Sequence, residues 1–329
     1  MTALLGRARS RELVSLVAPV ALPHPRAPGF VPRSHLALAL GTLLFGDVMD
    51  RVPLGRAYAV ERAEAGHPLV FDHGGVRTVA AASGALPAGA RAIARALEPL
   101  GYTKVGTYPL PALRMTGYAY AHRDAPETLP QYFVSELHPE QFSPAFAAAV
   151  ERVLASSVDP LAGRPTALLE RLATHGELPW ADAVALLPEL RAVFARQHDD
   201  PSLEDYDRLL AESDEMAWIA TEGQAFNHAT DRVDDVEAVC VAQRALGRPV
   251  KTEVSISRSG RVRQSAFVAC PVRRLFRTNT GHRVEREVPG SFWEFISRAR
   301  LPGGELDLTF DTGNATEIFA MTTATLRAG

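Results

Sequence analysis

The sequence predicts a mixed α+β protein in which two βαβββ modules form one curled sheet around a shared pocket, with helical regions added outside the sheet. The order strand, helix, strand, strand, strand can be read twice, over residues 69–138 and again over 226–297. The residues before and between these stretches repeat their apolar side chains at helical spacing. Hydrophobic residues make up 47% of the chain and charged residues 22%, which is typical of a globular protein with a large core.

These patterns divide the 329 residues into four regions. They are an N-terminal helical region (1–65), a first βαβββ module (66–140), a helical insertion (141–222), and a second βαβββ module with C-terminal strands (223–329). The two modules share no close sequence repeat, so the prediction depends on the order of their elements.

The charge, the cysteines and the absent motifs exclude several classes of protein. The formal net charge is −3, which gives no electrostatic reason to expect nucleic acid or a membrane surface as a partner. Cys240 and Cys270 form neither a disulfide framework nor a CxxC metal site, so we expect a reduced, cytoplasmic setting. The apolar run at 36–44 is too short to cross a bilayer and is expected to be a buried helix. Dinucleotide, P-loop and GxSxG hydrolase motifs are missing.

The N-terminal region is expected to be helical. Residues 1–20 show a short amphipathic pattern, and a connector rich in proline follows them. A second helical stretch covers residues 34–64, where Pro53 and Gly55 are expected to break the helix.

The first module begins with apolar runs at 69–71 and 76–82, which we expect to be strand material. A helix is expected over 87–100, because its apolar residues recur at helical spacing and Gly101 can end it. Turn-forming residues separate three further strands, at 103–108, 113–121 and 132–137.

The helical insertion is predicted from residues 142–198, which proline-containing steps interrupt. Residues 202–218 are acidic and are expected to form a further helix. The apolar spacing in the longer stretch is that of helices whose faces pack on a core.

The second module repeats the order of the first. A strand at 226–233 precedes a helix at 234–246, which has an acidic start and ends at Gly247. Further strands are expected at 250–256, 262–269, 283–288 and 292–296, with edge or closing strands at 306–310 and 317–323.

Three side chains could meet in the pocket between the modules. His73 follows the first apolar run of the first module, His228 lies in the first strand of the second module, and Glu294 lies in its last strand. Two histidines and one carboxylate suit a non-haem Fe(II) centre that keeps open coordination positions. The wide spacing leaves an alternative open, in which these are ordinary core or surface histidines and an exposed strand glutamate.

Three polar residues could bind a substrate beside such a metal. Arg77, four residues after His73, could hold a carboxylate in a bidentate manner, although spacing alone favours a surface charge in a turn flanked by glycine. Gln264 and Ser265 alternate along a strand, so one of them could point into the cavity. An exposed sheet face would explain both residues equally well.

Two further carboxylates lie near these positions. Glu136 occupies in the first module the place that Glu294 has in the second, so it could be a fourth ligand, a partner of the ligands or a solvated strand residue. Asp72 could orient the imidazole of His73. We do not expect it to, because adjacent strand residues point to opposite faces of a sheet.

Four segments of the chain carry a resemblance to a known family. They are Asp72-His73-Gly74-Gly75-Val76-Arg77, Phe226-Asn227-His228-Ala229-Thr230, Val262-Arg263-Gln264-Ser265-Ala266-Phe267, and Val288-Pro289-Gly290-Ser291-Phe292-Trp293-Glu294-Phe295. As a set they resemble the 2-oxoadipate dioxygenase/decarboxylase family, which is related to the vicinal-oxygen-chelate fold, 4-hydroxyphenylpyruvate dioxygenase and hydroxymandelate synthase. The set spans most of the chain between residues 70 and 300.

The resemblance implies a vicinal-oxygen-chelate-like pair of modules around one Fe(II) site. The resemblance implies that the metal ligands are His73, His228 and Glu294. It implies that Arg77 binds the substrate carboxylate and that Gln264 and Ser265 line the pocket. The implied enzyme is a non-haem Fe(II) oxygenase that acts on a 2-oxo acid, consumes O₂ and releases CO₂. For 2-oxoadipate, an intermediate of lysine catabolism, the product would be 2-hydroxyglutarate.

The chain also departs from the larger members of that family, because it has less sequence after Glu294. A carboxylate at the far end of a substrate needs its own cation, and Arg232, Arg263 and Lys251 are candidates. Two rival functions stay open. One is a divalent-metal-dependent hydrolase, lyase or isomerase of the same fold, which Glu136 as a fourth ligand would favour, and the other is a non-catalytic metal- or ligand-binding protein. A homodimer paired through edge strands is also considered.

Overall fold

The computed structural model of the protein describes residues 1–313. The first predicted module has the expected order of strand, helix, strand, strand, strand. Its elements are β2 (Phe71–Val79), α4 (Arg91–Leu97), β3 (Tyr102–Leu110), β4 (Met115–His122) and β5 (Gln131–Leu137). The apolar runs expected at 69–71 and 76–82 contribute to one continuous strand, because Gly74 and Gly75 between them extend like their neighbours.

The second module repeats this order. Its elements are β7 (His228–Arg232), α10 (Val236–Ala245), β8 (Ser255–Ile256), β9 (Val262–Ala266) and β12 (Phe292–Arg298). The strand expected over 250–256 is reduced to the two residues of β8, and one isolated bridge joins Val250 to Phe267.

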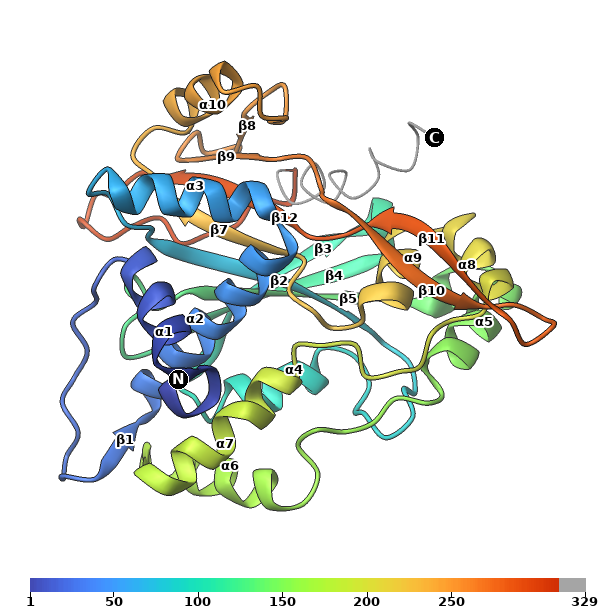
Figure 1. Cartoon of the computed structure of the whole chain (residues 1–329), viewed down its shortest axis with the longest axis horizontal. Coiled ribbons are helices and arrows are strands. Elements are labelled where there is room, and N and C mark those ends of the chain that lie inside the picture. The colour runs from blue at the N-terminus through green and yellow to red at the C-terminus, as the bar shows by residue number, and fades with distance from the viewer. Residues whose placement is uncertain (314–329) are drawn as a thin grey trace.

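All eight strands of the two modules form one sheet in the order β3-β4-β5-β2-β7-β12-β9-β8 (Figure 1). The strands β2 and β7 are antiparallel neighbours at its centre. Each of them also pairs in parallel with the last strand of its own module, β5 or β12. The prediction of two βαβββ modules in one curled sheet is therefore confirmed, and we call the β2–β7 contact between the modules the seam.

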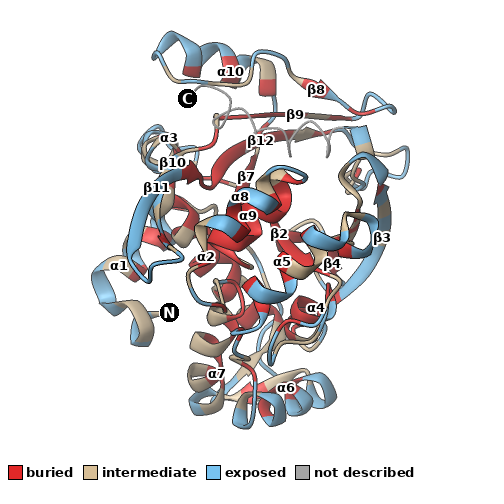
Figure 2. Ribbon diagram, turned by 90° about the vertical axis from the view of Figure 1, so that its right-hand side faces the viewer, coloured by how far each residue is buried: buried red, intermediate tan, exposed pale blue. Residues whose placement is uncertain are grey.

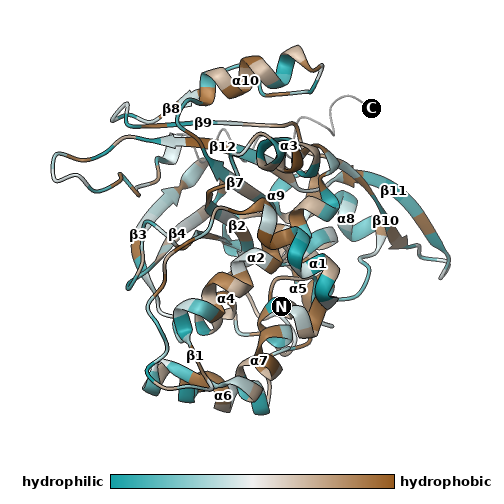
Figure 3. Ribbon diagram, turned by 60° about the vertical axis from the view of Figure 1, so that its left-hand side comes forward, coloured by the Kyte–Doolittle hydropathy of each residue, from teal (hydrophilic) through white to brown (hydrophobic). Residues whose placement is uncertain are grey.

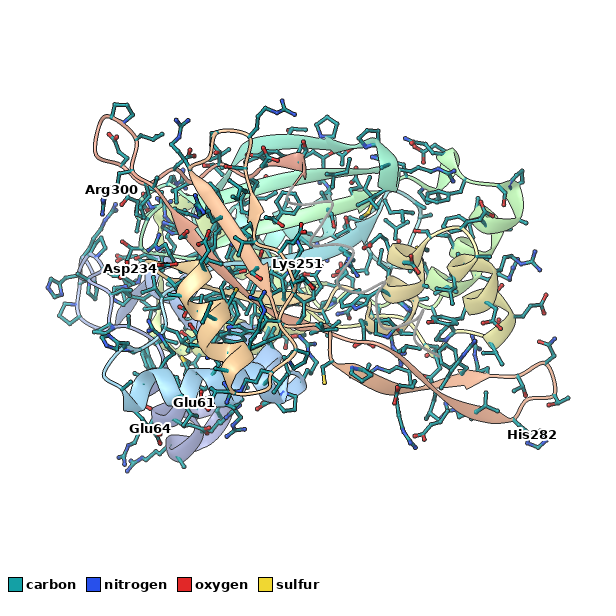
Figure 4. All side chains as sticks on the ribbon, turned by 90° about the horizontal axis from the view of Figure 1, so that it is seen from above. Glu61, Glu64, Asp234, Lys251, His282 and Arg300 are labelled. Atoms are coloured by element: carbon teal, nitrogen blue, oxygen red, sulfur yellow. The ribbon has the colours of Figure 1, made fainter. Side chains whose placement is uncertain are left out.

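Between β9 and β12 the chain leaves the sheet and forms a separate antiparallel ribbon of β10 (Pro271–Arg277) and β11 (Arg283–Pro289). The expectation that 283–288 belongs to the sheet is wrong, and β10 is a strand that the sequence patterns did not indicate. The ribbon is exposed on one face, while the other face packs Phe276 against Tyr206, with ring centroids 4.7 Å apart. His282 lies at its projecting tip (Figure 4).

The remaining elements are mostly helices, as expected. They are α1 (Thr2–Leu16), α2 (Arg33–Arg51), α3 (Pro53–Glu64), α5 (Pro144–Leu154), α6 (Arg164–His175), α7 (Trp180–Ala192), α8 (Leu203–Leu210) and α9 (Asp214–Glu222), with short 3-10 turns at Pro111–Leu113 and Pro139–Gln141. Two short strands, β1 (Phe30–Pro32) and β6 (Glu177–Pro179), pair with each other outside the main sheet. We keep the division into four regions, with boundaries at 65, 140 and 222, as a proposal.

The helix α2 is the buried helix expected over 36–44, and Leu36, Leu40, Leu43 and Leu44 are buried in it. Figure 2 shows that buried residues gather on the inner strands and on the helices beside them, and Figure 3 shows hydrophobic residues at the same places. Among residues 1–313, no helix combines the length and the apolar character needed to cross a membrane.

One face of β12 holds the sheet against the N-terminal helices. Trp293 packs edge-on against Phe45 of α2 at 5.0 Å between ring centroids, and Phe295 packs against Tyr58 of α3 at 4.9 Å. Burying an aromatic side chain of this size stabilises the fold by about 1.5–3 kcal/mol. Because strand residues alternate between faces, this packing also turns Glu294 toward the opposite side of the sheet.

The segment after β12 has no regular strand. The strand expected over 306–310 is wrong, since this segment makes only an isolated bridge between Leu306 and Arg300. It is held instead by the buried guanidinium of Arg298, whose Nη1 donates to the carbonyl oxygens of Asp307 at 2.9 Å and Thr309 at 3.0 Å. The strand expected over 317–323 lies outside the described residues.

Candidate metal centre

The structure brings together the three residues expected to bind a metal. His73 Nε2 lies 3.2 Å from Glu294 Oε2, and His228 Nε2 lies 3.4 Å from the same oxygen. One ligand atom from each residue lies within 4.8 Å of the others, and all three residues are buried. Two ligand atoms that lie about 2.1 Å from one ion at a right angle are about 3 Å apart, so the spacing fits a single divalent ion.

The seam of the sheet creates this arrangement. His73 and Gly75 lie on β2, and His228 on β7 pairs directly with Gly75. A Cβ atom at Gly75 would lie 2.4 Å from His228 Cε1, so only glycine leaves room for this imidazole. On its other side the His228 ring stacks on Phe292 of β12, with centroids 5.0 Å apart.

Asp72 orients His73, contrary to our expectation. Phe71 pairs with Asp231 and His73 pairs with Thr230, which leaves Asp72 as an extra residue in a β-bulge. The alternation of side chains fails at a bulge, and the Asp72 carboxylate therefore accepts a hydrogen bond from His73 Nδ1 at 2.8 Å. A proton held on Nδ1 leaves Nε2 free to bind a metal.

A buried arginine fixes Asp72 from behind. Arg298 Nε donates to both carboxylate oxygens of Asp72 at 3.0 Å, and its Nη2 donates to Oδ1 at 2.9 Å. Burial would raise the pKa of Asp72, but the charge of Arg298 and the hydrogen bonds with His73 and Arg298 together outweigh burial and lower it. Asp72 is therefore an anion at neutral pH and a strong acceptor for the His73 N–H.

The Glu294 carboxylate is also held at both oxygens. Thr230 Oγ1 donates to Oε2 at 2.7 Å, and Gln264 Nε2 donates to Oε1 at 2.8 Å. Burial would raise the pKa of Glu294, but its interactions with His73, His228 and Thr230 together outweigh burial and lower it. For His73, burial would lower the pKa, and its hydrogen bonds with Asp72 and Glu294 raise it instead.

His228 supplies the clearest sign of a missing partner. Burial lowers the pKa of its imidazole to about 3, so the ring is neutral at physiological pH. Neither ring nitrogen makes a hydrogen bond to the described residues, although the ring is buried. Buried polar atoms are nearly always satisfied. A divalent ion that prefers nitrogen and oxygen ligands would satisfy Nε2 and complete the set with His73 and Glu294, so these residues fit an Fe(II) ion.

The centre lies in the wall of a cavity between the two modules. The described residues that line this cavity are His73, Gly75, Arg77, Phe133, Ser135, Asn227, His228, Gln264, Phe292, Glu294, Phe310 and Asp311. Phe310 packs edge-on against His73 with centroids 5.0 Å apart. A wall that combines aromatic side chains with convergent polar groups is typical of a site for a small molecule.

Arg77 is a buried residue of β2, so the alternative of a surface charge in a turn is wrong. It lies four strand positions after His73 on the same face, which places the two Cα atoms about 13 Å apart along the strand. Its Nε lies 2.7 Å from Glu215 Oε2 of α9, and its guanidinium carbon lies 4.6 Å from the ring centre of Trp218. Burial raises the pKa of Glu215 to about 7, although Arg77 opposes the shift.

Ser265, an expected pocket residue, and Glu136, which was considered as a ligand, lie elsewhere. Ser265 pairs with Phe295 and so faces the helices, whereas Gln264 faces the cavity. Glu136 accepts a hydrogen bond from the backbone N–H of Ala90 at 2.6 Å, where α4 begins. It is neither a fourth ligand nor a partner of the ligands, because on β5 it pairs with Thr78, five residues beyond His73 on β2.

The three cations considered for a distant carboxylate do not line the described cavity. Arg232 donates to the carbonyl of Glu127, Arg263 pairs with Glu237 and Lys251 bonds to Ser255. Within residues 1–313, Arg77 is the only cation in the cavity wall.

Sequence reasoning also missed two residues that contact the site. Thr230 could have been found, because it follows His228 by two residues and so shares its strand face. No sequence pattern indicates that Glu215 contacts the site, since acids in the first turn of a helix are common at protein surfaces.

Comparison with known proteins identifies the family. Residues 50–306 match the family model of the 2-oxoadipate dioxygenase/decarboxylases. The chain belongs to this family. A curated family member from rice, the 2-oxoadipate dioxygenase/decarboxylase of chloroplasts and amyloplasts, is 24% identical over 291 residues, which cover 79% of this chain and 71% of the rice protein.

Solved structures show the same fold. A protein from Ralstonia eutropha JMP134 that is assigned to the glyoxalase superfamily is 53% identical, with a TM-score of 0.91, over 94% of this chain and 96% of its own. Hydroxyglutarate synthase from rice, solved with 2-oxoadipate, is 20% identical with a TM-score of 0.66 over 92% of this chain and 98% of its own. The vicinal-oxygen-chelate-like fold expected from the sequence is therefore confirmed.

Proposed function

We propose that the protein is an Fe(II)-dependent dioxygenase/decarboxylase that acts on a 2-oxo carboxylic acid, with 2-oxoadipate as the candidate substrate. The reaction would consume O₂, release CO₂ and form 2-hydroxyglutarate. Membership of the family supports this proposal. The observation that carries it is the buried group of His73, His228 and Glu294, which opens onto a cavity with an arginine in its wall.

Each residue around the centre has a defined task in this proposal. A bound Fe(II) ion would activate O₂ and polarise the 2-oxo acid at the coordination positions that three protein ligands leave open. Asp72 keeps the proton on His73 Nδ1, so that Nε2 stays available as a ligand atom. Thr230 and Gln264 keep the Glu294 carboxylate turned toward the two imidazoles.

Arg77 would bind the substrate carboxylate that is remote from the metal. It is the cation in the described cavity wall, and it lies well along β2 from His73. A bidentate guanidinium at that distance suits a substrate with a second carboxylate at its far end. The side chains of Phe133, Phe292 and Phe310 would enclose the methylene groups between the two ends and exclude water.

The rival functions lose the observations that would have favoured them. Glu136 as a fourth ligand would support a metal-dependent hydrolase, lyase or isomerase, but Glu136 accepts a hydrogen bond from the backbone N–H of Ala90. Separation of the two histidines from Glu294 would support a non-catalytic binding protein, but these three residues lie together.

The test is oxygen uptake by the protein loaded anaerobically with Fe(II), with a panel of 2-oxo acids and with CO₂ trapped in parallel. We expect O₂ consumption and CO₂ release in equal amounts with 2-oxoadipate. Metal binding without any O₂ consumption across the panel would contradict the proposal and would favour a metal-dependent hydrolase, lyase or isomerase.

The role of Arg77 has its own prediction. Arg77→Lys keeps the charge but loses the planar fork, and Arg77→Ala loses both. We expect the KM for 2-oxoadipate to rise about tenfold in the first variant and about a hundredfold in the second, while metal affinity stays unchanged. Steady-state kinetics and a chelator titration measure the two quantities, and an unchanged KM in both variants would exclude a role for Arg77 in binding the substrate.

A further inference from the structure

The helix α9 contacts Arg77 of the cavity wall through Glu215, an acid of its first turn that is buried. Ser213 caps the helix by accepting a hydrogen bond from Met216 N at 3.1 Å, and Asp214 and Glu215 follow in the first turn. Acids at a helix start normally stay in water. Glu215 is only 3% exposed, because its side chain points inward to Arg77.

Glu215 and Trp218 hold the Arg77 guanidinium on two sides. Being three residues apart, they share one face of α9. Glu215 Oε2 lies 2.7 Å from Arg77 Nε, and the guanidinium carbon lies over the Trp218 ring, 4.6 Å from its centre. Trp218 is fixed in turn, because its Nε1 donates to the carbonyl of Gly290 at 3.1 Å.

We propose that Glu215 and Trp218 are positioning residues that present the Arg77 guanidinium to the far carboxylate of a dicarboxylic 2-oxo acid. This inference rests on the proposed function and goes further by assigning recognition of the second carboxylate to α9. An arginine side chain has several rotatable bonds, and a ligand that must first order them binds more weakly. Contacts at the Nε edge and at the ring face remove that freedom before the ligand arrives.

The same helix contains a matched ion pair that does not reach the cavity. Glu222 is also buried, and Arg274 Nε and Nη2 donate to its two carboxylate oxygens at 2.7 Å each. Neither Glu222 nor Arg274 lines the described cavity. If ion pairs on α9 only stabilise the fold, removal of Glu215 and removal of Glu222 must have similar consequences.

The experiment compares two six-carbon 2-oxo acids that differ in the second carboxylate, 2-oxoadipate and 2-oxohexanoate. Their affinities are measured by anaerobic calorimetry on the Fe(II)-loaded wild type, Glu215→Ala, Glu215→Gln and Glu222→Ala. The KM and kcat for 2-oxoadipate are measured alongside. Metal affinity is followed in every variant by chelator competition.

In Glu215→Ala we expect the affinity for 2-oxoadipate to fall at least about tenfold and its KM to rise equally. Affinity for 2-oxohexanoate, kcat and metal affinity should each change less than about threefold, because none of them depends on the second carboxylate. Glu215→Gln should recover most of the loss, since a side chain of the same shape keeps a polar oxygen beside Arg77 Nε. Glu222→Ala should bind both acids like the wild type.

An equal loss of affinity for both acids in Glu215→Ala, or unchanged 2-oxoadipate binding in that variant, would overturn this inference and leave the proposed function standing. A wild type that binds neither acid would overturn both. Should Glu215→Ala fail to fold, Trp218→Leu tests the same idea. It removes the support under the guanidinium and keeps Glu215, and it should weaken 2-oxoadipate at least about threefold more than 2-oxohexanoate. Equal weakening would again refute the positioning role.

Discussion

Adding one methyl group at Gly75 should remove the metal while leaving the protein folded. In Gly75→Ala the new Cβ atom would lie 2.4 Å from His228 Cε1, 2.9 Å from His228 Nδ1 and 2.4 Å from Asn227 Oδ1. Carbon atoms in contact prefer about 3.5–4.0 Å, so the His228 imidazole must shift by about 1 Å. The stacked Phe292 ring on its other side limits the directions in which it can move.

The size of the shift decides the outcome. A metal–nitrogen bond tolerates about 0.2 Å of error, so a displacement of about 1 Å takes His228 out of the coordination sphere. Loss of an outer partner of a ligand typically costs ten- to a hundredfold in affinity, and loss of a ligand itself costs more. We therefore expect the Kd for Fe(II) to rise at least about a hundredfold, with a loss of about 1–3 kcal/mol in the free energy of unfolding of the apoprotein.

The assay is a chelator competition with Fe(II) or Co(II), paired with urea unfolding of the apoprotein. Gly74→Ala is the matched control, because its Cβ would lie 1.5 Å from Phe226 Cε1 on the opposite face of the same strand. That variant should lose more stability and less metal affinity than Gly75→Ala. Wild-type metal affinity in a folded Gly75→Ala protein would refute the assignment of His228 as a ligand held against the seam.

Two further predictions concern the charges around the sheet. Arg298→Met removes the guanidinium that holds Asp72 and two hydrogen bonds to the segment after β12, so it should lower stability by about 3–5 kcal/mol and metal affinity about ten- to a hundredfold. Unchanged metal affinity in a chelator titration would show that Arg298 does not act on His73 through Asp72. Burial raises the pKa of Asp231 to about 6, although the hydrogen bond from Tyr58 opposes this shift. The contribution of Asp231 to stability is therefore fully present below about pH 4 and is lost as the pH rises through 6, and the loss is on the order of 3 kcal/mol. Asp231→Asn should flatten that slope in urea unfolding between pH 4.5 and 7.5, and an unchanged slope would contradict it.

The regular elements could be predicted because their apolar residues repeat with the period of the structure they form. The strands β4 and β5 and the helix α2 follow this rule, since each buries a continuous face. The ribbon of β10 and β11 could not be placed by the same rule. It buries only Phe276, Val288 and Pro289, and charged residues occur on both of its faces, so its sequence lacks the alternation of apolar and polar residues.

A residue of the candidate site can be predicted from spacing alone only when it shares a strand with another site residue. His73, His228 and Glu294 come from three strands, and their places in the two modules together with the resemblance to a family, rather than any local spacing, link them. The alternation of side chains along a regular strand predicts that Asp72 points away from His73, and the bulge that breaks this rule exists only in the pairing of β2 with β7. Glu215 depends on the packing of a helix against a strand that is distant in sequence, so nothing near either residue indicates their contact.

The seam also has a consequence for biosynthesis. His73 belongs to the half of the sheet that the ribosome makes first, while His228 and Glu294 belong to the half made last. A nascent chain therefore has no complete metal site until β12 has paired with β7, and an incompletely folded molecule cannot hold iron in this way. An Fe(II) ion bound as we propose would therefore enter only molecules that have completed the sheet, which would keep a redox-active ion away from the exposed interior of a half-made protein.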